Sequence, residues 1–206
     1  MPEPAKPNIG AILLAAGNSS RMGRPKQQLT VNNQPLLRRT TQIISVVGLD
    51  EVLIVLGAFA DQHRELVHGL DVEVIENAAW AQGMGGSLKH GLKALLAHKP
   101  DLDAVIISVC DQPYLSVEVF HQLINKYQER NCKIVASAYA GINGVPTLFD
   151  QRLFDQLLGI DDGAGAKRII KQFSNLVETV PFELGKMDLD TPEDYDEWLK
   201  GQGSER

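Results

Sequence analysis

The residues with the clearest capacity for chemistry lie in one glycine-rich stretch near the start of the chain, residues 13–26, which reads Leu-Leu-Ala-Ala-Gly-Asn-Ser-Ser-Arg-Met-Gly-Arg-Pro-Lys. It combines Gly17 and Gly23 with two serine hydroxyls and the cations Arg21 and Lys26. Glycines let the backbone approach a ligand closely, and successive N–H groups in such a turn form an anion-binding concavity. Two fixed cations beside that concavity suit a polyphosphate better than a single carboxylate. We therefore interpret the stretch as a nucleoside triphosphate loop.

The stretch departs from two better-known phosphate-binding patterns. A P-loop needs four residues between its first glycine and a Gly-Lys-Ser/Thr, whereas five residues separate Gly17 from Gly23 and the lysine comes later still. The dinucleotide pattern Gly-x-Gly-x-x-Gly does not follow the first strand either. The remaining alternative is a tight turn that needs its glycines only for geometry. That alternative does not explain two serines and two cations placed directly after a buried strand.

A second group of candidate residues is acidic. Asp111 follows the most strand-like run of the chain, and the carboxyl end of a central strand is where open α/β sheets bind ligands. Carboxylate oxygens suit Mg²⁺, which usually binds through one or two carboxylates and the substrate phosphates. The alternative is that Asp111 only starts a turn before Gln112 and Pro113. Asp188 and Asp190 precede a helix start at Thr191, and capping of that helix does not account for them.

These residues must be positioned by strands and helices that alternate along the chain. The alternation predicts an α/β fold with three layers and a mostly parallel sheet. We expect one domain over residues 9–200, with disordered tails at 1–8 and 201–206. Glycines before Ser87 predict a flexible loop that feeds a helix N-terminus, either as an anion site or as a plain serine-capped loop. The expected strands are Ile9–Leu14, Glu51–Leu56, Val72–Ile75, Ala104–Val109, Lys133–Ser137, Val177–Val180 and Met187–Asp190, and the expected helices include Pro35–Val47, Asp61–Leu66 and Val117–Glu129.

Composition excludes several classes of function. The chain has 206 residues, a formal net charge of −6 and 44% hydrophobic residues, which is ordinary for a globular domain and unsuited to nucleic-acid binding. No run approaches the ~20 apolar residues of a membrane span. The proline-rich start does not resemble a signal peptide. Two cysteines, Cys110 and Cys132, form neither a metal spacing nor a disulfide framework. We expect a protein of the reducing cytoplasm.

The glycine-rich stretch resembles the opening signature of nucleotidyltransferases of the sugar-nucleotide type, Leu-Ala-Ala-Gly-x-Ser-x-Arg-Met-Gly-x-x-Lys. The most similar branch attaches a nucleotide to the molybdenum cofactor, and the chain is identified as a member of this MobA-like group. Four further segments match in the family's order, at residues 77–87, 111–113, 144–149 and 188–194. The matching residues that the resemblance places at the nucleotide are Leu14, Ala15, Ala16, Gly17, Ser19, Arg21, Met22, Gly23, Lys26, Asn77, Gly83, Met84 and Ser87.

The resemblance also implies roles. Lys26 and Arg21 would act catalytically on the triphosphate, and Asp111 and Asp190 would meet across one Mg²⁺. Asp188 is expected to point away from Asp190 and to matter less. The family fold implied is the Rossmann-like nucleotide-diphospho-sugar transferase fold, which is similar to glycosyltransferase A. On the acceptor side the resemblance and the neighbouring glycine–alanine turn suggest Gln112, Gly144, Pro146 and Lys167.

The reaction implied is transfer of CMP from CTP to the phosphate of molybdenum-loaded molybdopterin, giving molybdopterin cytosine dinucleotide and pyrophosphate. The guanylyl-transferring branch opens Leu-Ala-Gly-Gly, whereas this chain has Ala16 and Pro25, so CTP is favoured and GTP is the alternative. A sugar- or polyol-phosphate nucleotidyltransferase is a rival with the same fold. A carrier that inserts the finished cofactor into an apo-enzyme is the non-enzymatic rival. A recipient molybdoenzyme or its insertion chaperone would be the protein partner.

Overall fold

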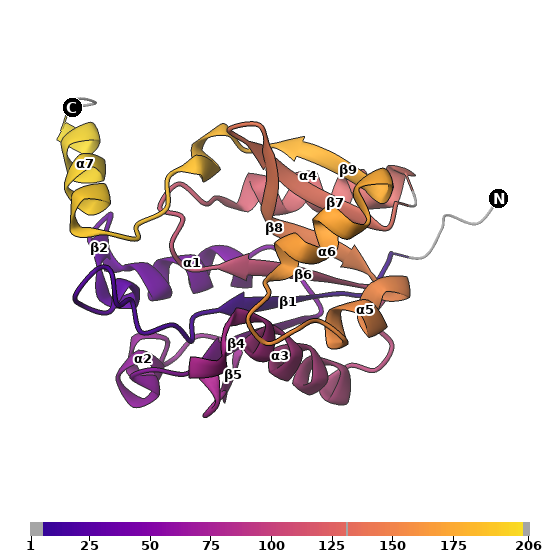
Figure 1. Cartoon of the computed structure of the whole chain (residues 1–206), viewed down its shortest axis with the longest axis horizontal. Coiled ribbons are helices and arrows are strands. Elements are labelled where there is room, and N and C mark those ends of the chain that lie inside the picture. The colour runs from indigo at the N-terminus through magenta and orange to yellow at the C-terminus, as the bar shows by residue number, and fades with distance from the viewer. Residues whose placement is uncertain (1–5, 131, 204–206) are drawn as a thin grey trace.

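The computed structural model describes residues 6–130 and 132–203. Its centre is a seven-stranded sheet with the order β5-β4-β1-β6-β8-β7-β9 (Figure 1). Strand β8 is antiparallel to both of its neighbours, and the other pairings in this sheet are parallel. The sheet strands are β1 (Ile9–Leu14), β4 (Glu51–Leu56), β5 (Glu73–Glu76), β6 (Ala104–Val109), β7 (Ile134–Tyr139), β8 (Ile142–Asp150) and β9 (Val177–Pro181).

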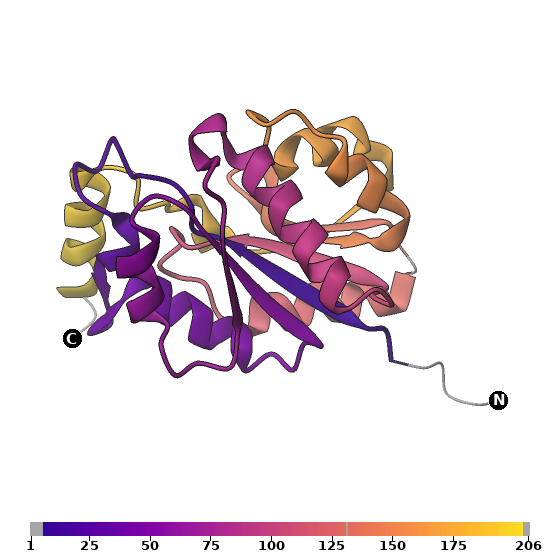
Figure 2. The ribbon, with the colours of Figure 1, turned by 90° about the horizontal axis from the view of Figure 1, so that it is seen from below.

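Helices cover both faces of the sheet and complete the three predicted layers. Apolar side chains of α1 and α4 pack on one face, and those of α3, α5 and α6 pack on the other. Figure 2 shows α3 crossing its face of the sheet beside the later helices. The helices are α1 (Leu36–Ser45), α2 (Ala60–Leu66), α3 (Met84–His98), α4 (Val117–Arg130), α5 (Phe154–Leu158), α6 (Ala166–Gln172) and α7 (Pro192–Gly203).

The register of the central strands places three loops side by side at the carboxyl ends of these strands. Leu14 at the end of β1 pairs with Val55 of β4 and with Val109 of β6. The chain therefore leaves these three parallel strands at the same level. The glycine-rich loop follows β1, Gly57 follows β4 and Asp111 follows β6, so residues far apart in sequence meet at these strand ends.

Helix α7 and a small hairpin form a separate apolar cluster at the end of the molecule where the glycine-rich loop lies. The hairpin consists of β2 (Thr30–Val31) and β3 (Gln34–Pro35). Figure 1 shows α7 standing beside β2. The buried residues that join the loop, the hairpin and α7 are Met22, Leu29, Val31, Leu36, Leu189 and Trp198. Short 3₁₀ turns complete the described elements, at Lys26–Gln28, Trp80–Gln82, Gln151–Leu153, Ser174–Leu176 and Glu183–Lys186.

The three-layer, mostly parallel fold is confirmed, and several boundaries are corrected. Pro35 pairs with Thr30 in the hairpin, so α1 begins one residue later than expected. Helix α2 begins at Ala60 after Phe59, whose φ of 59° is left-handed, and Asp61 lies in its first turn. Residues 187–190 do not form a strand, because their backbone groups pair with a loop.

The predicted domain limits agree only in part with the described residues. Asn8 is held by Asp103 and Asp101, and α7 continues to Gly203, beyond the expected limit at residue 200. The rest of the predicted tails, 1–5 and 204–206, lies outside the described residues. None of the helices in the described part of the chain has the length and apolar character needed to cross a membrane.

Candidate active site

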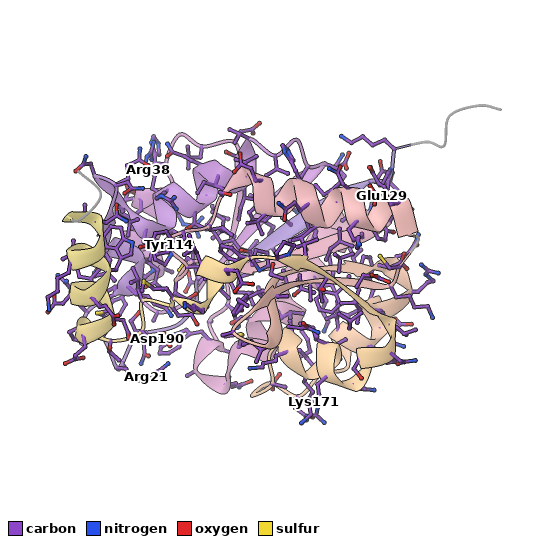
Figure 3. All side chains as sticks on the ribbon, turned by 90° about the horizontal axis from the view of Figure 1, so that it is seen from above. Arg21, Arg38, Tyr114, Glu129, Lys171 and Asp190 are labelled. Atoms are coloured by element: carbon purple, nitrogen blue, oxygen red, sulfur yellow. The ribbon has the colours of Figure 1, made fainter. Side chains whose placement is uncertain are left out.

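Two carboxylates meet at the ammonium group of Lys26. Its Nζ lies 2.5 Å from Oδ2 of Asp111 and 3.0 Å from Oδ1 of Asp190. Arg21 donates to the other oxygen of Asp190 at 2.7 Å, and Figure 3 shows these two residues together beside α7. The four residues come from the glycine-rich loop, the end of β6 and the segment before α7. Both predicted metal ligands and both predicted catalytic cations therefore lie in one cluster.

The opposite charges in this cluster stabilise the ionised forms of its side chains. Burial would lower the pKa of Lys26, but the nearby carboxylates of Asp111 and Asp190 outweigh it and raise that pKa above its ordinary value. Burial would raise the pKa of Asp190, but Lys26 and Arg21 hold it below the usual range. Lys26 thus stays an ammonium and Asp190 a carboxylate at neutral pH.

The donor set at this cluster fits a divalent metal held jointly by the protein and by phosphates. Oδ1 of Asp111 is buried and has no hydrogen-bond partner, so one carboxylate oxygen is available as a ligand. Within the described residues, no three acidic, histidine or cysteine side chains are arranged as a complete metal site. One or two carboxylates are what Mg²⁺ uses when substrate phosphates supply the other ligands.

Asp188 lies on the same side of its segment as Asp190, which corrects the expectation that it points away. Leu189 between them is fully buried in the cluster with α7, and its N–H donates to the carbonyl of Asp111 at 2.9 Å. Since alternate side chains of an extended segment share a side, both aspartates line one pocket. Burial, together with Asp111 and Asp190, raises the pKa of Asp188 to about 7.

This raised pKa predicts that the ligand-free protein loses stability as the pH rises. The carboxyl of Asp188 titrates near pH 7 when folded and near pH ~3.9 when unfolded, so the folded state holds an extra proton between these values. The stabilising contribution of the Asp188 carboxyl is complete below its pKa in the unfolded state. This contribution is lost as the pH rises through its pKa in the folded state. Asp188→Asn should therefore be more stable than wild type at about pH 8, and equal to it near pH ~4, in urea unfolding. A difference independent of pH would contradict this assignment.

The glycine-rich loop is held by side chains that turn inward. Ser19, with a φ of 55°, accepts a hydrogen bond on its hydroxyl from the N–H of Lys26 at 3.0 Å. Gln27 is fully buried and donates to the carbonyls of Ala15 and Gly17 at 2.9 and 3.0 Å. The sequence analysis missed Gln27, because its only signal was its place next to Lys26. These bonds fix the backbone on which Lys26 is carried.

Two pockets open on either side of this cluster. The first has a volume of about 480 Å³ and is lined by the glycine-rich loop, the turn at Trp80 and the start of α3. The second has a volume of about 350 Å³ and is lined by β7, β8, the start of α6 and the acidic segment before α7. The residues that line both pockets are Leu14, Lys26, Met84, Val109 and Asp111.

Most of the residues expected at the nucleotide line the first pocket, namely Leu14, Ala15, Ala16, Gly17, Lys26, Gly83, Met84 and Ser87. The other five do not line this pocket. Asn77 is buried, donates to the hydroxyl of Ser87 at 3.0 Å and accepts from the N–H of Ala79. Met22 is buried against α7, and Gly23 has a left-handed φ of 71°, a conformation that suits glycine.

On the acceptor side, three of the four expected residues line the second pocket. These are Gln112, Gly144 and Lys167. The amide nitrogen of Gln112 donates to the carbonyls of Val145 and Gly185 at 3.2 and 3.0 Å, whereas its side-chain oxygen Oε1 is buried and has no hydrogen-bond partner. Pro146 is buried at an irregularity where β7 and β8 shift register, a position that tolerates the missing N–H of proline. Gln112 and Pro146 thus shape the pocket wall.

The helix start expected near Ser87 lies at a different residue, and its first N–H groups have a different partner from the one expected. Helix α3 begins at Met84, after Gly83. The N–H groups of Gly85 and Gly86 donate to the carbonyl of Asp162 at 2.8 and 3.2 Å. Lys89 adds an ion pair to the same aspartate at 2.6 Å. These first-turn N–H groups therefore attach the loop before α6 to α3 and are not directed at an anion.

Gly17 gives a direct test of the first pocket. A Cβ added at Gly17 would meet no atom within 4 Å, and the residue lines the pocket, so a side chain there would project into open space. Gly17→Val should therefore fold normally and lose triphosphate binding in a calorimetric titration. Gly201→Val should bind as wild type does, because this exposed position on α7 lies outside the pocket and an added Cβ would meet only the Tyr114 hydroxyl, at 4.0 Å. Normal binding by Gly17→Val would show that the loop does not cradle the phosphates.

Comparison with known proteins agrees with this geometry. Residues 11–178 match the MobA-like NTP transferase domain. Nicotine blue oxidoreductase of Paenarthrobacter nicotinovorans is 30% identical over 84% of this chain and 87% of its own length. The molybdenum cofactor cytidylyltransferase of Escherichia coli is 24% identical over 91% of this chain and 93% of its own. The molybdenum cofactor guanylyltransferase of Burkholderia cenocepacia is 34% identical over 60% of this chain and 58% of its own.

Solved structures share the fold over nearly the whole chain. A mycobacterial protein from Mycobacterium sp. strain JC1 superposes with a TM-score of 0.77 and 26% identity, covering 97% of this chain and 98% of its own. The 4-diphosphocytidyl-2C-methyl-D-erythritol synthase of Anaerococcus prevotii has a TM-score of 0.73 at 20% identity, covering 95% of this chain and all of its own. We conclude that the chain belongs to the MobA-like NTP transferase family of nucleotidyltransferases.

Proposed function

We propose that the protein transfers CMP from CTP to the phosphate of molybdenum-loaded molybdopterin. The observation that carries this proposal is that two pockets meet at Lys26 and Asp111. Group transfer needs the donor phosphorus and the acceptor oxygen held within contact distance, and a pair of pockets with a shared wall provides that arrangement. The first pocket would hold CTP and the second the pterin.

In the reaction, an oxygen of the acceptor phosphate attacks the α-phosphorus of CTP. The bond from that phosphorus to the bridging oxygen of the β-phosphate breaks, and pyrophosphate leaves with the electron pair. Lys26 and Arg21 lie where they can stabilise the charge that grows on the leaving group. Asp111 and Asp190 would hold Mg²⁺, which would neutralise phosphate charge. The chain's own residues thus contribute position and charge, with no covalent step.

The second pocket has an apolar wall on which a flat heterocycle could lie. Met84 and Ile142 are 51% and 40% exposed and border this pocket, and Val145 and Ile170 continue its apolar lining. A pterin ring would cover these side chains, and the charged residues of the same pocket would meet its polar edge. Lys167 on the same pocket provides a cation for the acceptor phosphate.

The acceptor is tested by incubating the protein with CTP, Mg²⁺ and one acceptor at a time and measuring pyrophosphate. Molybdenum-loaded molybdopterin should support release, and sugar-1-phosphates or polyol phosphates should not. Release with a sugar phosphate alone would move the protein to the sugar-nucleotide branch. Binding of the pterin without any pyrophosphate release would favour the carrier function instead.

For the nucleotide, Ala16 predicts a preference for CTP over GTP. It is 5% exposed and lines the first pocket, so its methyl group takes room that a purine would need. The cytidylyltransferase relative also aligns over nearly the whole chain. Ala16→Gly should reduce the CTP/GTP ratio of kcat/KM by about tenfold, as expected when one methyl group is removed from a binding pocket. A wild-type preference for GTP would contradict the assignment.

A further inference from the structure

We propose that Trp80, held in place by Gly57, is the surface on which the nucleobase stacks. This inference rests on the proposed nucleotide pocket and adds a specificity-determining side chain to it. Trp80 is the single aromatic residue among those that line the first pocket. The residue is partly exposed, which leaves part of its surface open to a ligand.

The position of the base follows from the two pockets. The reacting α-phosphate must lie where the pockets meet, at Lys26 and Asp111. The base must then lie in the part of the first pocket that the second does not share. Trp80 belongs to that part, together with Ala15, Ala16 and Ala81. Small apolar side chains beside one indole form a narrow slot, which suits the π-face of a base.

Gly57 at the end of β4 makes this position of the indole possible. A Cβ added at Gly57 would lie 2.6 Å from Cβ of Trp80 and 2.7 Å from the carbonyl oxygen of Ala16, distances too short for real contacts. Only a residue without a side chain therefore lets Trp80 lie against the start of the glycine-rich loop. The backbone of Gly57 is not left-handed, so alanine there would act through these two contacts, with the Trp80 side chain and with the carbonyl of Ala16.

The turn that carries Trp80 is also fixed. Its N–H donates to the carbonyl of Asn77 at 3.1 Å, and its carbonyl accepts from the N–H of Gly83 at 3.1 Å. The side chain of Asn77 accepts from Ala79 and donates to Ser87 on α3. A stacking surface held in this way loses little freedom when a base binds.

Fluorescence can report on Trp80 directly, because the chain has two tryptophans and the other, Trp198, is a buried residue of α7. In Trp198→Phe the emission comes from Trp80 alone. CTP and CMP should quench it, and tripolyphosphate, which has no base, should not. Trp80→Phe, which retains only Trp198, should show no change with either nucleotide. If Trp198→Phe does not fold, the difference between wild type and Trp80→Phe gives the same information.

Variants of the first pocket distinguish a loss of base stacking from a general loss of ligand binding. By calorimetry, Trp80→Ala should weaken CTP binding about tenfold and leave tripolyphosphate binding unchanged, and Trp80→Phe should restore most of the loss. Gly57→Ala, whose methyl group meets both Trp80 and the carbonyl of Ala16, should also weaken CTP binding. CTP binding without any change in Trp80 emission, or an equal loss of tripolyphosphate binding in Trp80→Ala, would overturn the inference while leaving the pocket assignment intact. Failure of every triphosphate to bind would overturn both. Quenching by GTP in place of CTP would support the stacking role and reject CTP as the substrate.

Discussion

Replacing either Asp111 or Asp190 by asparagine should lower kcat by about 10²–10³-fold, the size of effect seen when one preorganised charge-stabilising group is lost. Both carboxylates contact the same Lys26 ammonium, and together they form the proposed metal site. The double variant should therefore lose little more than either single one, because residues that act as a unit have non-additive effects. The measurement is kcat for the three variants over a magnesium titration.

Two comparisons make this result specific. Asp155→Asn, at an exposed position on α5 away from both pockets, should retain wild-type kcat. Asp188→Asn should lose less than the other two, because Asp188 has no ion pair with Lys26. Multiplicative losses at Asp111 and Asp190 would show that they work independently and would contradict a shared metal.

Replacing Lys26 by alanine should lower kcat by about 10²-fold or more, with a much smaller rise in KM for the triphosphate. The ammonium lies at the wall that both pockets share, beside the expected position of the leaving group. Its charge should matter most in the transition state, where the leaving pyrophosphate becomes most negative. Steady-state kinetics over a range of CTP concentrations separate the two parameters.

Arg24→Ala is the matched control, since Arg24 belongs to the same loop but lies over the ring of Tyr195, 5.3 Å from its centre. It should keep nearly wild-type kinetics. An unchanged kcat with only a raised KM in Lys26→Ala would indicate uniform binding of substrate and transition state.

Much of the fold could be predicted because its central strands are short apolar runs followed by glycine or an acid. Ile9–Leu14 and Ala104–Val109 form strands with the predicted limits, since both are buried on two faces and carry no competing polar pattern. The approach of Asp111 and Asp190 followed from the resemblance to a family, and the rule about strand ends applies to Asp111 alone, because residues 187–190 form no strand.

The rest depended on hydrogen bonds between distant segments, which residue types do not specify. Residues 187–190 alternate like a strand, but the N–H of Leu189 pairs with the carbonyl of Asp111 and not with a neighbouring strand. Gln112 is a second case, because its amide nitrogen joins the carbonyls of Val145 and Gly185, which are distant in the sequence. The first turn of α3 offered free N–H groups in sequence, and the carbonyl of Asp162 accepts two of them.

The central claim, transfer of a nucleotidyl group from CTP, is tested most directly by labelling CTP in turn at its α- and γ-phosphates and following each label with molybdenum-loaded molybdopterin and Mg²⁺. The α-label should appear in a pterin dinucleotide and the γ-label in pyrophosphate, in equal amounts, and both transfers should stop in Asp111→Asn. Transfer of the γ-label to the acceptor, or movement of neither label, would contradict the account.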